Sequence, residues 1–153
     1  MTYYLTDGAH VLISGATGAG DEFGGKSVLA NWWFERSYAR GWSDLALFYN
    51  PKGLGYVRGR TVSTLSGLAQ SYRAGNRLFD FRPQSDVEAT HEQVVETLEQ
   101  LPGRKIVVHD EAQSYQKSSK LNRSLAQLGN MSNASTPTDD IRSLVVTQRP
   151  WNL

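Results

Sequence analysis

The segment from residue 11 to residue 33 reads VLISGATGAGDEFGGKSVLANWW, and it constrains the fold more than any other part of the chain. It begins with a short apolar run, which favours a strand, and then passes at once into glycines. The residues from Lys26 onward favour a helix that ends at Gly41. A strand joined by a glycine-rich loop to a helix predicts a protein in which strands and helices alternate.

The rest of the chain continues this alternation. Four more strands are predicted from the apolar runs DLALFY, RLFDF, KIVVH and SLVVT, and helical spacing of apolar residues predicts helices over 65–75, 85–101 and 121–128. The helix over 85–101 is expected to begin with a capping box of Ser85 and Glu88. KIVVH is too apolar to face solvent on either side, which is typical of a central parallel strand. We therefore predict a single α/β domain over residues 1–153, with a mainly parallel sheet of about five strands and helices on both faces.

Composition limits the classes of protein to which the chain can belong. Of its 153 residues, 39% are hydrophobic and 20% are charged, as in packed globular domains. It has neither a run of about eighteen apolar residues nor a secretory signal, so we expect no membrane segment and a cytoplasmic location. The lack of cysteine excludes disulfide scaffolds and thiolate metal sites, and the net charge of +1 neither supports nor excludes DNA as a partner.

The glycine-rich segment contains the pattern GxxxxGK[ST] between Gly20 and Ser27. In this pattern, backbone N–H groups surround phosphate oxygens, the lysine reaches the β- and γ-phosphates, and the serine hydroxyl binds Mg²⁺. The alternative is a glycine-rich turn without a ligand, which the flanking strand and helix disfavour. The predicted nucleotide-binding residues are Gly20, Gly24, Gly25, Lys26, Ser27 and Val28.

A second register of the same pattern overlaps the first. Without residues 21–25 the segment would read GATGAGKS, so the loop looks like a phosphate loop with a five-residue insertion. Gly25, Lys26 and Ser27, nearest the helix, keep their places in either register. Asp21 and Glu22 add negative charge near a site built for an anion, which weakens binding unless both side chains point outward.

Polar side chains follow two of the other predicted strands. Asp110, after IVVH, fits a residue that holds Mg²⁺ directly or through water, and Glu111 fits a general base that polarises the attacking water. Gln148, after VVT, is suited to hydrogen-bond that water or the γ-phosphate. The alternative is that these residues are only polar strand ends or helix caps. Because ligands bind at the carboxyl ends of parallel strands, we expect the three side chains to converge there.

Four motifs occur in an order that resembles the FtsK/HerA-type DNA-pumping ATPases. They are the phosphate loop, NPKG after the second strand, IVVHDEA and VVTQRP. The resemblance covers most of the chain and implies a P-loop NTPase fold of the RecA-like class with an additional catalytic glutamate. It also implies that Gln148 ends a strand lying between the phosphate-loop strand and the Asp110 strand. The implied catalytic residues are Glu111, Gln148 and Lys26, and the implied metal ligands are Ser27 and Asp110.

The resemblance further implies a function and partners. Members of the family hydrolyse ATP with Mg²⁺ to move double-stranded DNA, as in genome packaging or transfer, and they assemble as homo-oligomeric rings such as hexamers. In such rings an arginine of the neighbouring subunit completes the site, and Arg123 and Arg142 are candidates here. Longer members continue beyond the position of Trp151 with further strand and helix, so this domain is expected to lack those C-terminal elements.

Two other functions fit the same residues. The chain also resembles ATPases for virion or secretion assembly, the zonula-occludens-toxin-like phage proteins, and a viral source would make it virion-associated. The second alternative is a structural protein that binds nucleotide without hydrolysing it, which Asp21 and Glu22 suggest.

Several other conspicuous residues are interpreted as structural. Trp32, Trp33 and Phe34 are candidates for base stacking, but aromatic residues on a helix beside a sheet usually pack in the core, and three consecutive ones cannot all share one face. His91 shares the apolar face of its helix and is interpreted as packed at the helix edge, not as a catalytic base. His109 is expected to point to the opposite face of the sheet from Asp110.

Overall fold

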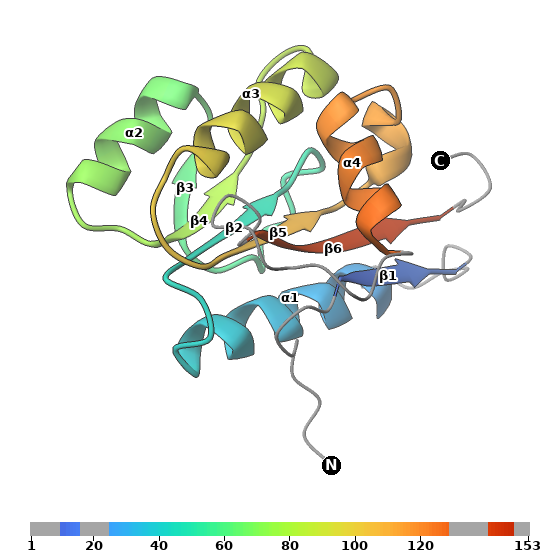
Figure 1. Cartoon of the computed structure of the whole chain (residues 1–153), viewed down its shortest axis with the longest axis horizontal. Coiled ribbons are helices and arrows are strands. Elements are labelled where there is room, and N and C mark those ends of the chain that lie inside the picture. The colour runs from blue at the N-terminus through green and yellow to red at the C-terminus, as the bar shows by residue number, and fades with distance from the viewer. Residues whose placement is uncertain (1–9, 16–24, 129–140, 149–153) are drawn as a thin grey trace.

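The computed structural model describes residues 10–15, 25–128 and 141–148. Its sheet contains six strands, all parallel, in the order β1-β6-β5-β2-β4-β3 (Figure 1). The strands are β1 (Val11–Ser14), β2 (Leu45–Tyr49), β3 (Arg60–Val62), β4 (Leu78–Phe81), β5 (Lys105–His109) and β6 (Ile141–Thr147). The helices are α1 (Gly25–Ala39), α2 (Leu65–Arg73), α3 (Val87–Glu99) and α4 (Ser119–Leu128), with a 3-10 helix, η1 (Ala112–Tyr115). The predicted α/β class is confirmed.

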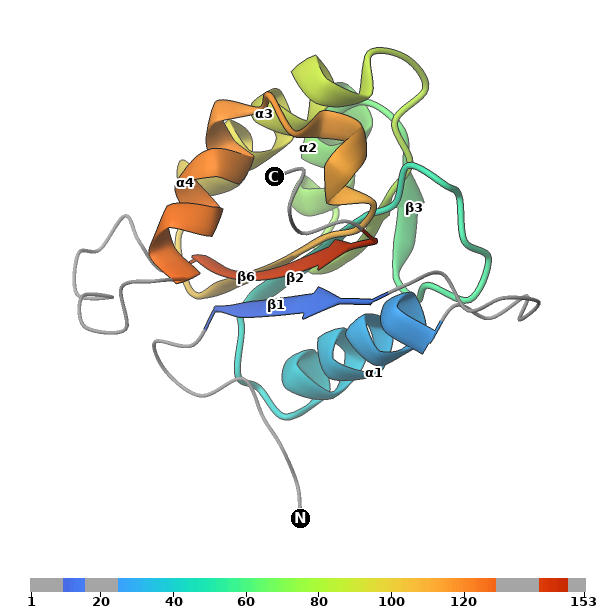
Figure 2. The same cartoon turned by 90° about the vertical axis from the view of Figure 1, so that its right-hand side faces the viewer.

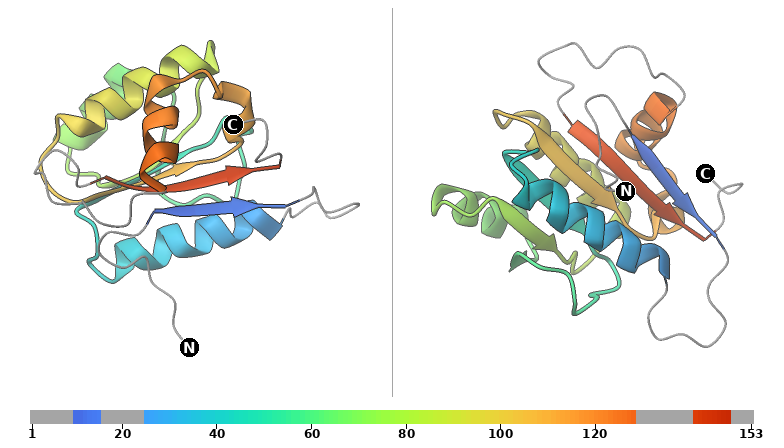
Figure 3. Two further views of the ribbon diagram at one scale, coloured as in Figure 1. Left: turned by 45° about the vertical axis from the view of Figure 1, so that its right-hand side comes forward. Right: turned by 90° about the horizontal axis from the view of Figure 1, so that it is seen from below.

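The helices cover both faces of the sheet, as predicted. Helix α1 lies against one face, and α2, α3 and α4 lie against the other (Figure 2). Seen from below, α1 runs across the sheet alone (Figure 3). The two central strands, β2 and β5, are buried along their whole length, which explains why their sequences are apolar on both faces.

The described sheet has one strand more than the five predicted. Strand β3 pairs in parallel with β4 and forms one edge of the sheet, with Thr61 opposite Asp80. Only Val62 of its three residues is buried, so no apolar run marks this strand in the sequence. Strand β3 is therefore held mainly by backbone pairing with β4, and its side chains contribute little to the core.

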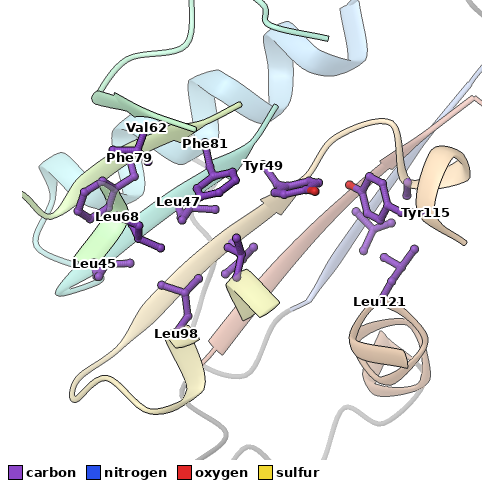
Figure 4. Close-up of a cluster of buried hydrophobic side chains, with 14 residues drawn as sticks. Leu45, Leu47, Tyr49, Val62, Leu68, Phe79, Phe81, Leu98, Tyr115 and Leu121 are labelled. Atoms are coloured by element: carbon purple, nitrogen blue, oxygen red, sulfur yellow. The ribbon is translucent and has the colours of Figure 1, made fainter. Parts of the chain in front are cut away.

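The larger core cluster lies between the sheet and helices α2, α3 and α4 (Figure 4). Strand β2 contributes Leu45, Leu47 and Tyr49 to this cluster, and the helices contribute residues such as Leu68 and Leu98. Burial of each side chain of this size stabilises the fold by about 1.5–3 kcal/mol relative to exposure. The cluster fixes three helices to the strands whose carboxyl ends carry the predicted site.

A second cluster lies between the sheet and α1. Phe34 is fully buried and meets Phe48 edge to face, with ring centroids 5.6 Å apart. Trp33 packs against the same cluster, whereas Trp32 is exposed beneath the Arg36 guanidinium, which lies 4.6 Å from the ring centroid. The core interpretation is therefore confirmed for Phe34 and Trp33, and the outward position of Trp32 agrees with the expectation that three successive helical residues cannot share one face.

The helix ends agree with the glycine signals, but the predicted capping box is wrong. Helix α3 is capped by Asp86, whose Oδ1 accepts a hydrogen bond from the Ala89 amide at 3.1 Å. The carboxylate of Glu88 instead accepts from the Lys117 amide at 2.9 Å, so a tertiary contact takes the side chain that the capping box requires. Helix α1 ends just before Gly41, which has a φ of +70°, as expected for a helix C-terminus.

Two fully buried histidines form a hydrogen-bonded chain between the sheet and α3. The Nε2 atom of His91 lies 2.8 Å from Nδ1 of His109, and Nε2 of His109 lies 3.1 Å from the Ser143 hydroxyl. Nδ1 of His91 lies 2.7 Å from the Ser118 hydroxyl. Each of the four ring nitrogens thus has a neutral hydrogen-bond partner. Such pairing allows a polar ring to be buried without a large cost in stability. His91 is a core residue, buried more deeply than the helix-edge position predicted for it.

We predict that acid destabilises the fold through these histidines. Burial lowers the pKa of His91 from 6.5 to about 3, so the unfolded chain binds this proton at a higher pH than the folded chain does. Stability is complete above pH 6.5 and falls as the pH drops toward 3. Between pH 7 and pH 5, His91 should account for a loss of about 2 kcal/mol in the free energy of unfolding. Urea unfolding of the wild type and His91→Gln at both pH values measures the difference, and equal pH dependence in the two proteins would contradict it.

We also predict that Gly59, just before β3, cannot be replaced by alanine without a large loss of stability. Its φ is +114°, and an added Cβ would lie 2.7 Å from the carbonyl oxygen of Leu78. Gly59→Ala should lower the free energy of unfolding by about 2 kcal/mol or more, because strained backbone and a clash with β4 act together. The matched control is Gly55→Ala, where no described atom lies within 4 Å of the added Cβ. Urea unfolding measures both variants, and a similar free energy of unfolding for the two would show that the backbone at Gly59 is not constrained in this way.

Candidate functional site

The polar strand ends meet at one edge of the sheet because all described strands run in the same direction. The carboxyl ends of β1, β5 and β6 lie at this edge, and α1 begins beside them (Figure 3). Of the predicted nucleotide-binding residues, Gly25, Lys26, Ser27 and Val28 form the first turn of α1. Gly20 and Gly24 lie outside the described residues, so the choice between the two loop registers stays a prediction.

Ser27 and Asp110, the two predicted metal ligands, are in direct contact. The Ser27 hydroxyl donates a 2.9 Å hydrogen bond to Oδ1 of Asp110 and so joins the start of α1 to the end of β5. The neighbouring His109 points to the α3 face, where it meets His91, which confirms the predicted alternation. Two residues that are 83 positions apart in sequence are therefore held side by side by strand direction and helix placement.

Asp110 is a buried carboxyl group with incomplete hydrogen bonding. Its side chain is fully buried, and Oδ2 has no hydrogen-bond partner among the described residues. Burial raises the pKa of Asp110 to about 6, the hydrogen bond from Ser27 lowers it in part, and the charge of Glu111 raises it further. An ionised carboxylate in such a place is costly unless a cation or a donor reaches it.

Glu111 lies at the same edge and has several donors around it. Its backbone is left-handed, with a φ of 54°, which turns the chain sharply after β5. Oε1 accepts from Lys52 Nζ at 2.5 Å and from Gln148 Nε2 at 3.4 Å, and Oε2 accepts from Gln113 Nε2 at 2.6 Å. The side chain of Gln113 is in turn bonded to Thr147 of β6 at 3.1 Å. The carboxylate is thus oriented from both neighbouring strands.

Strand β6 lies between β1 and β5, so the strand order implied for Gln148 is confirmed. Gln148 reaches Glu111, as expected from that order. Lys26 lies close to the end of β1, since a Cβ added to Gly15 would meet Lys26 Cδ at 3.8 Å. Val28 is 41% exposed at the start of α1. The structure therefore brings the described members of the predicted site to one edge of the sheet.

Two contacts of the site were not predicted from sequence. Lys52 belongs to the NPKG turn after β2, and Gln113 follows Glu111 by two residues. The sequence predicts NPKG as the turn that closes the second strand, but not its contact with Glu111, which follows from the pairing of β2 with β5. Of the two arginines proposed to act on a neighbouring subunit, Arg142 is only 7% exposed in the first half of β6, which does not suit that role, whereas Arg123 is exposed and pairs with Glu99.

Ser27 and Asp110 carry oxygen atoms of the kind that a magnesium ion binds. Mg²⁺ usually keeps several waters and binds through one or two carboxylates together with substrate phosphates. Asp110 offers a buried oxygen without a partner and Ser27 offers a hydroxyl, so the two fit this ion. A group of three or more His, Cys, Asp or Glu, which would suit other metals, does not occur among the described residues.

Comparison with models of known protein families, with curated proteins and with solved structures found no match for this chain. Within the described residues, no helix is long and apolar enough to cross a membrane.

We predict that Asp110→Asn stabilises the ligand-free protein. With a pKa raised to about 6, the wild-type carboxylate opposes folding increasingly as the pH rises from 3.8 to 6, and the penalty is constant above that range. Removal of the charge should therefore raise the free energy of unfolding by about 1–3 kcal/mol at pH 8, and by much less at pH 4. Urea unfolding measures both values. Glu96→Gln, on the exposed side of α3, is the control and should change neither. A loss of stability in Asp110→Asn at pH 8 would contradict the prediction.

Proposed function

We propose that this chain is a P-loop ATPase of the RecA-like class with an additional catalytic glutamate, and that it hydrolyses ATP with Mg²⁺. The observation that carries the proposal is the 2.9 Å hydrogen bond between Ser27, at the start of α1, and Asp110, at the end of β5. This contact joins the GK[ST] end of the sequence pattern to the acidic strand end that the same chemistry requires. Glu111 and Gln148 lie beside it, 3.4 Å apart.

In this proposal each residue has one task. Lys26 and the backbone amides of the loop and first helical turn, with Gly20, Gly24, Gly25 and Val28, bind the phosphates. Ser27 and Asp110 hold Mg²⁺, which neutralises charge on the phosphates when it is bound. The N-terminus of α1 lies at the same edge and adds favourable partial charge for an anion.

Glu111 is the proposed general base. It takes the proton of the attacking water, whose oxygen displaces ADP from the γ-phosphorus and yields inorganic phosphate. Gln148 is suited to orient the water or sense the γ-phosphate because a neutral amide both donates and accepts. Its contact with Glu111 supports this role, because a water that contacts Glu111 would also lie within reach of Gln148.

The proposed partner is double-stranded DNA, moved by a homo-oligomeric ring of the FtsK/HerA type, as in genome packaging or transfer. The order of motifs and the position of β6 between β1 and β5 support this assignment. With a net charge of only +1, contact with DNA would come from a local patch or from the ring as a whole. Arg123 is the better placed of the two proposed neighbour-acting arginines because it is exposed. A cytoplasmic or virion-associated location goes with this function.

Binding without hydrolysis is a second candidate, and one contact favours it. Both oxygens of Glu111 are occupied by donors, including the positive charge of Lys52 at 2.5 Å. A carboxylate whose two oxygens are both engaged by donors is not available to contact an attacking water. The chain would then be a nucleotide-binding structural protein, unless the ion pair opens when nucleotide binds.

We predict that Glu111→Gln abolishes hydrolysis and leaves nucleotide binding intact. Phosphate release from Mg-ATP should fall by about 100-fold or more, because the general base is lost while the phosphate contacts remain. Wild type and variant are measured with and without duplex DNA at one fixed salt concentration, since salt controls DNA contacts. DNA should stimulate only the wild type.

The control is Glu96→Gln, which should behave as the wild type does. ATP binding without turnover in the wild type would favour the structural alternative over the motor. If the wild type does not bind ATP at all, the whole proposal fails.

A further inference from the structure

Lys52 contacts the proposed general base, Glu111, but has no role in the mechanism described above. It lies in the turn after β2, and β2 pairs with β5 with Tyr49 opposite His109, so the turn lies directly beside Asp110 and Glu111. Lys52 Nζ is 2.5 Å from Glu111 Oε1, and the lysine side chain is 47% exposed. The ammonium group therefore reaches the site from the β2 side, opposite Lys26 on the β1 side.

The backbone that carries Lys52 is firmly held. Asn50 is buried, and its Nδ2 donates to Asp80 Oδ1 at 2.9 Å and to the Leu54 carbonyl at 3.1 Å, while its Oδ1 accepts from the Leu54 amide at 2.9 Å. Asp80 is also buried and pairs with Arg82 at 2.8 Å. The turn is thus fixed by a network of hydrogen bonds, whereas Lys52 extends from it on a flexible four-carbon side chain that is 47% exposed.

Two anions could pair with Lys52: the carboxylate of Glu111 and the phosphates of a bound nucleotide. In the ligand-free site its charge meets a single carboxylate, that of Glu111, and occupies the Oε1 atom of that group. A bound nucleoside triphosphate would place several negative charges at the same sheet edge, and Coulomb attraction grows with that charge. A lysine on a flexible four-carbon stem moves easily to the stronger anion.

We propose that Lys52 is a switching cation that pairs with Glu111 when the site is empty and with the terminal phosphate of a bound triphosphate. Its transfer releases Glu111 for catalysis only when a γ-phosphate is present, and so couples the general base to the identity of the nucleotide. This inference rests on the proposed function. It names a residue that distinguishes triphosphate from diphosphate, and it removes the conflict between a base and the ion pair that blocks it.

The test is the binding of Mg-ATP and Mg-ADP, measured by calorimetry in a Glu111→Gln background. That substitution prevents turnover and removes the competing carboxylate charge, so Lys52→Met then reports only on contact with nucleotide. Lys52→Met should weaken ATP binding about 10-fold to 100-fold, as expected for loss of a hydrogen bond between charged groups. ADP binding should change by less than about 3-fold, because ADP lacks the terminal phosphate. Lys52→Arg should keep most of the preference for ATP, and Lys117→Met, an exposed lysine in another segment, is the control.

The outcomes separate the two proposals. If the Glu111→Gln protein binds ATP but Lys52→Met leaves the ratio of ATP to ADP affinity unchanged, Lys52 does not contact the terminal phosphate and this inference is wrong, while the ATPase proposal stands. Equal weakening for both nucleotides would also overturn it, since that result indicates a general effect on the fold or on charge. If the Glu111→Gln protein binds neither nucleotide, both proposals fail together.

Discussion

The burial of Asp110 is the constraint on which the candidate site depends. A fully buried carboxylate with one oxygen lacking a partner among the described residues is the kind of group that folding normally avoids. The fold retains it because β5 is central and apolar, so the end of this strand is carried to the sheet edge whatever residue stands there. The raised pKa of Asp110 expresses this cost. Such a cost is understandable when a cation completes the site, and residues with strongly shifted pKa values gather at functional sites for this reason.

The position of Asp110 also depends on the opposite face of the same strand. His109, one residue earlier, is locked by His91 on α3 and by Ser143 on β6. These neutral hydrogen bonds fix the end of β5 from the α3 side, and the hydrogen bond from Ser27 fixes it from the α1 side. Because successive side chains of a strand point to opposite faces, His109 and Asp110 have different roles. One side chain anchors the backbone, and the next turns its carboxyl group toward the start of α1, where Ser27 donates to it.

Sequence patterns predicted most of this arrangement where local chemistry decides it. The buried strands β2 and β5 were evident because strands covered on both faces must be apolar throughout. Ser27, Asp110, Glu111 and Gln148 were predictable because each stands next to a recognised strand or helix boundary. Strand β3 was missed because it is short and exposed, and the capping box was wrong because Glu88 serves a tertiary contact instead. The full phosphate loop remains a prediction, since Gly20 and Gly24 lie outside the described residues.

Lys52 shows why contacts around a site are harder to predict than the site itself. Its charge and its place in a turn are visible in the sequence, but its partner depends on which strand lies next to β2. That neighbour is β5, whose residues pair with residues of β2 that stand 60 positions earlier in the sequence, as in Tyr49 with His109 and Leu45 with Lys105. The contact therefore follows from topology, not from a local pattern. 

A contact between residues so far apart in sequence can be predicted only when the strand order is known. With that order known, a cation in the turn after β2 is expected beside a carboxylate just after β5, because the two strands pair in parallel.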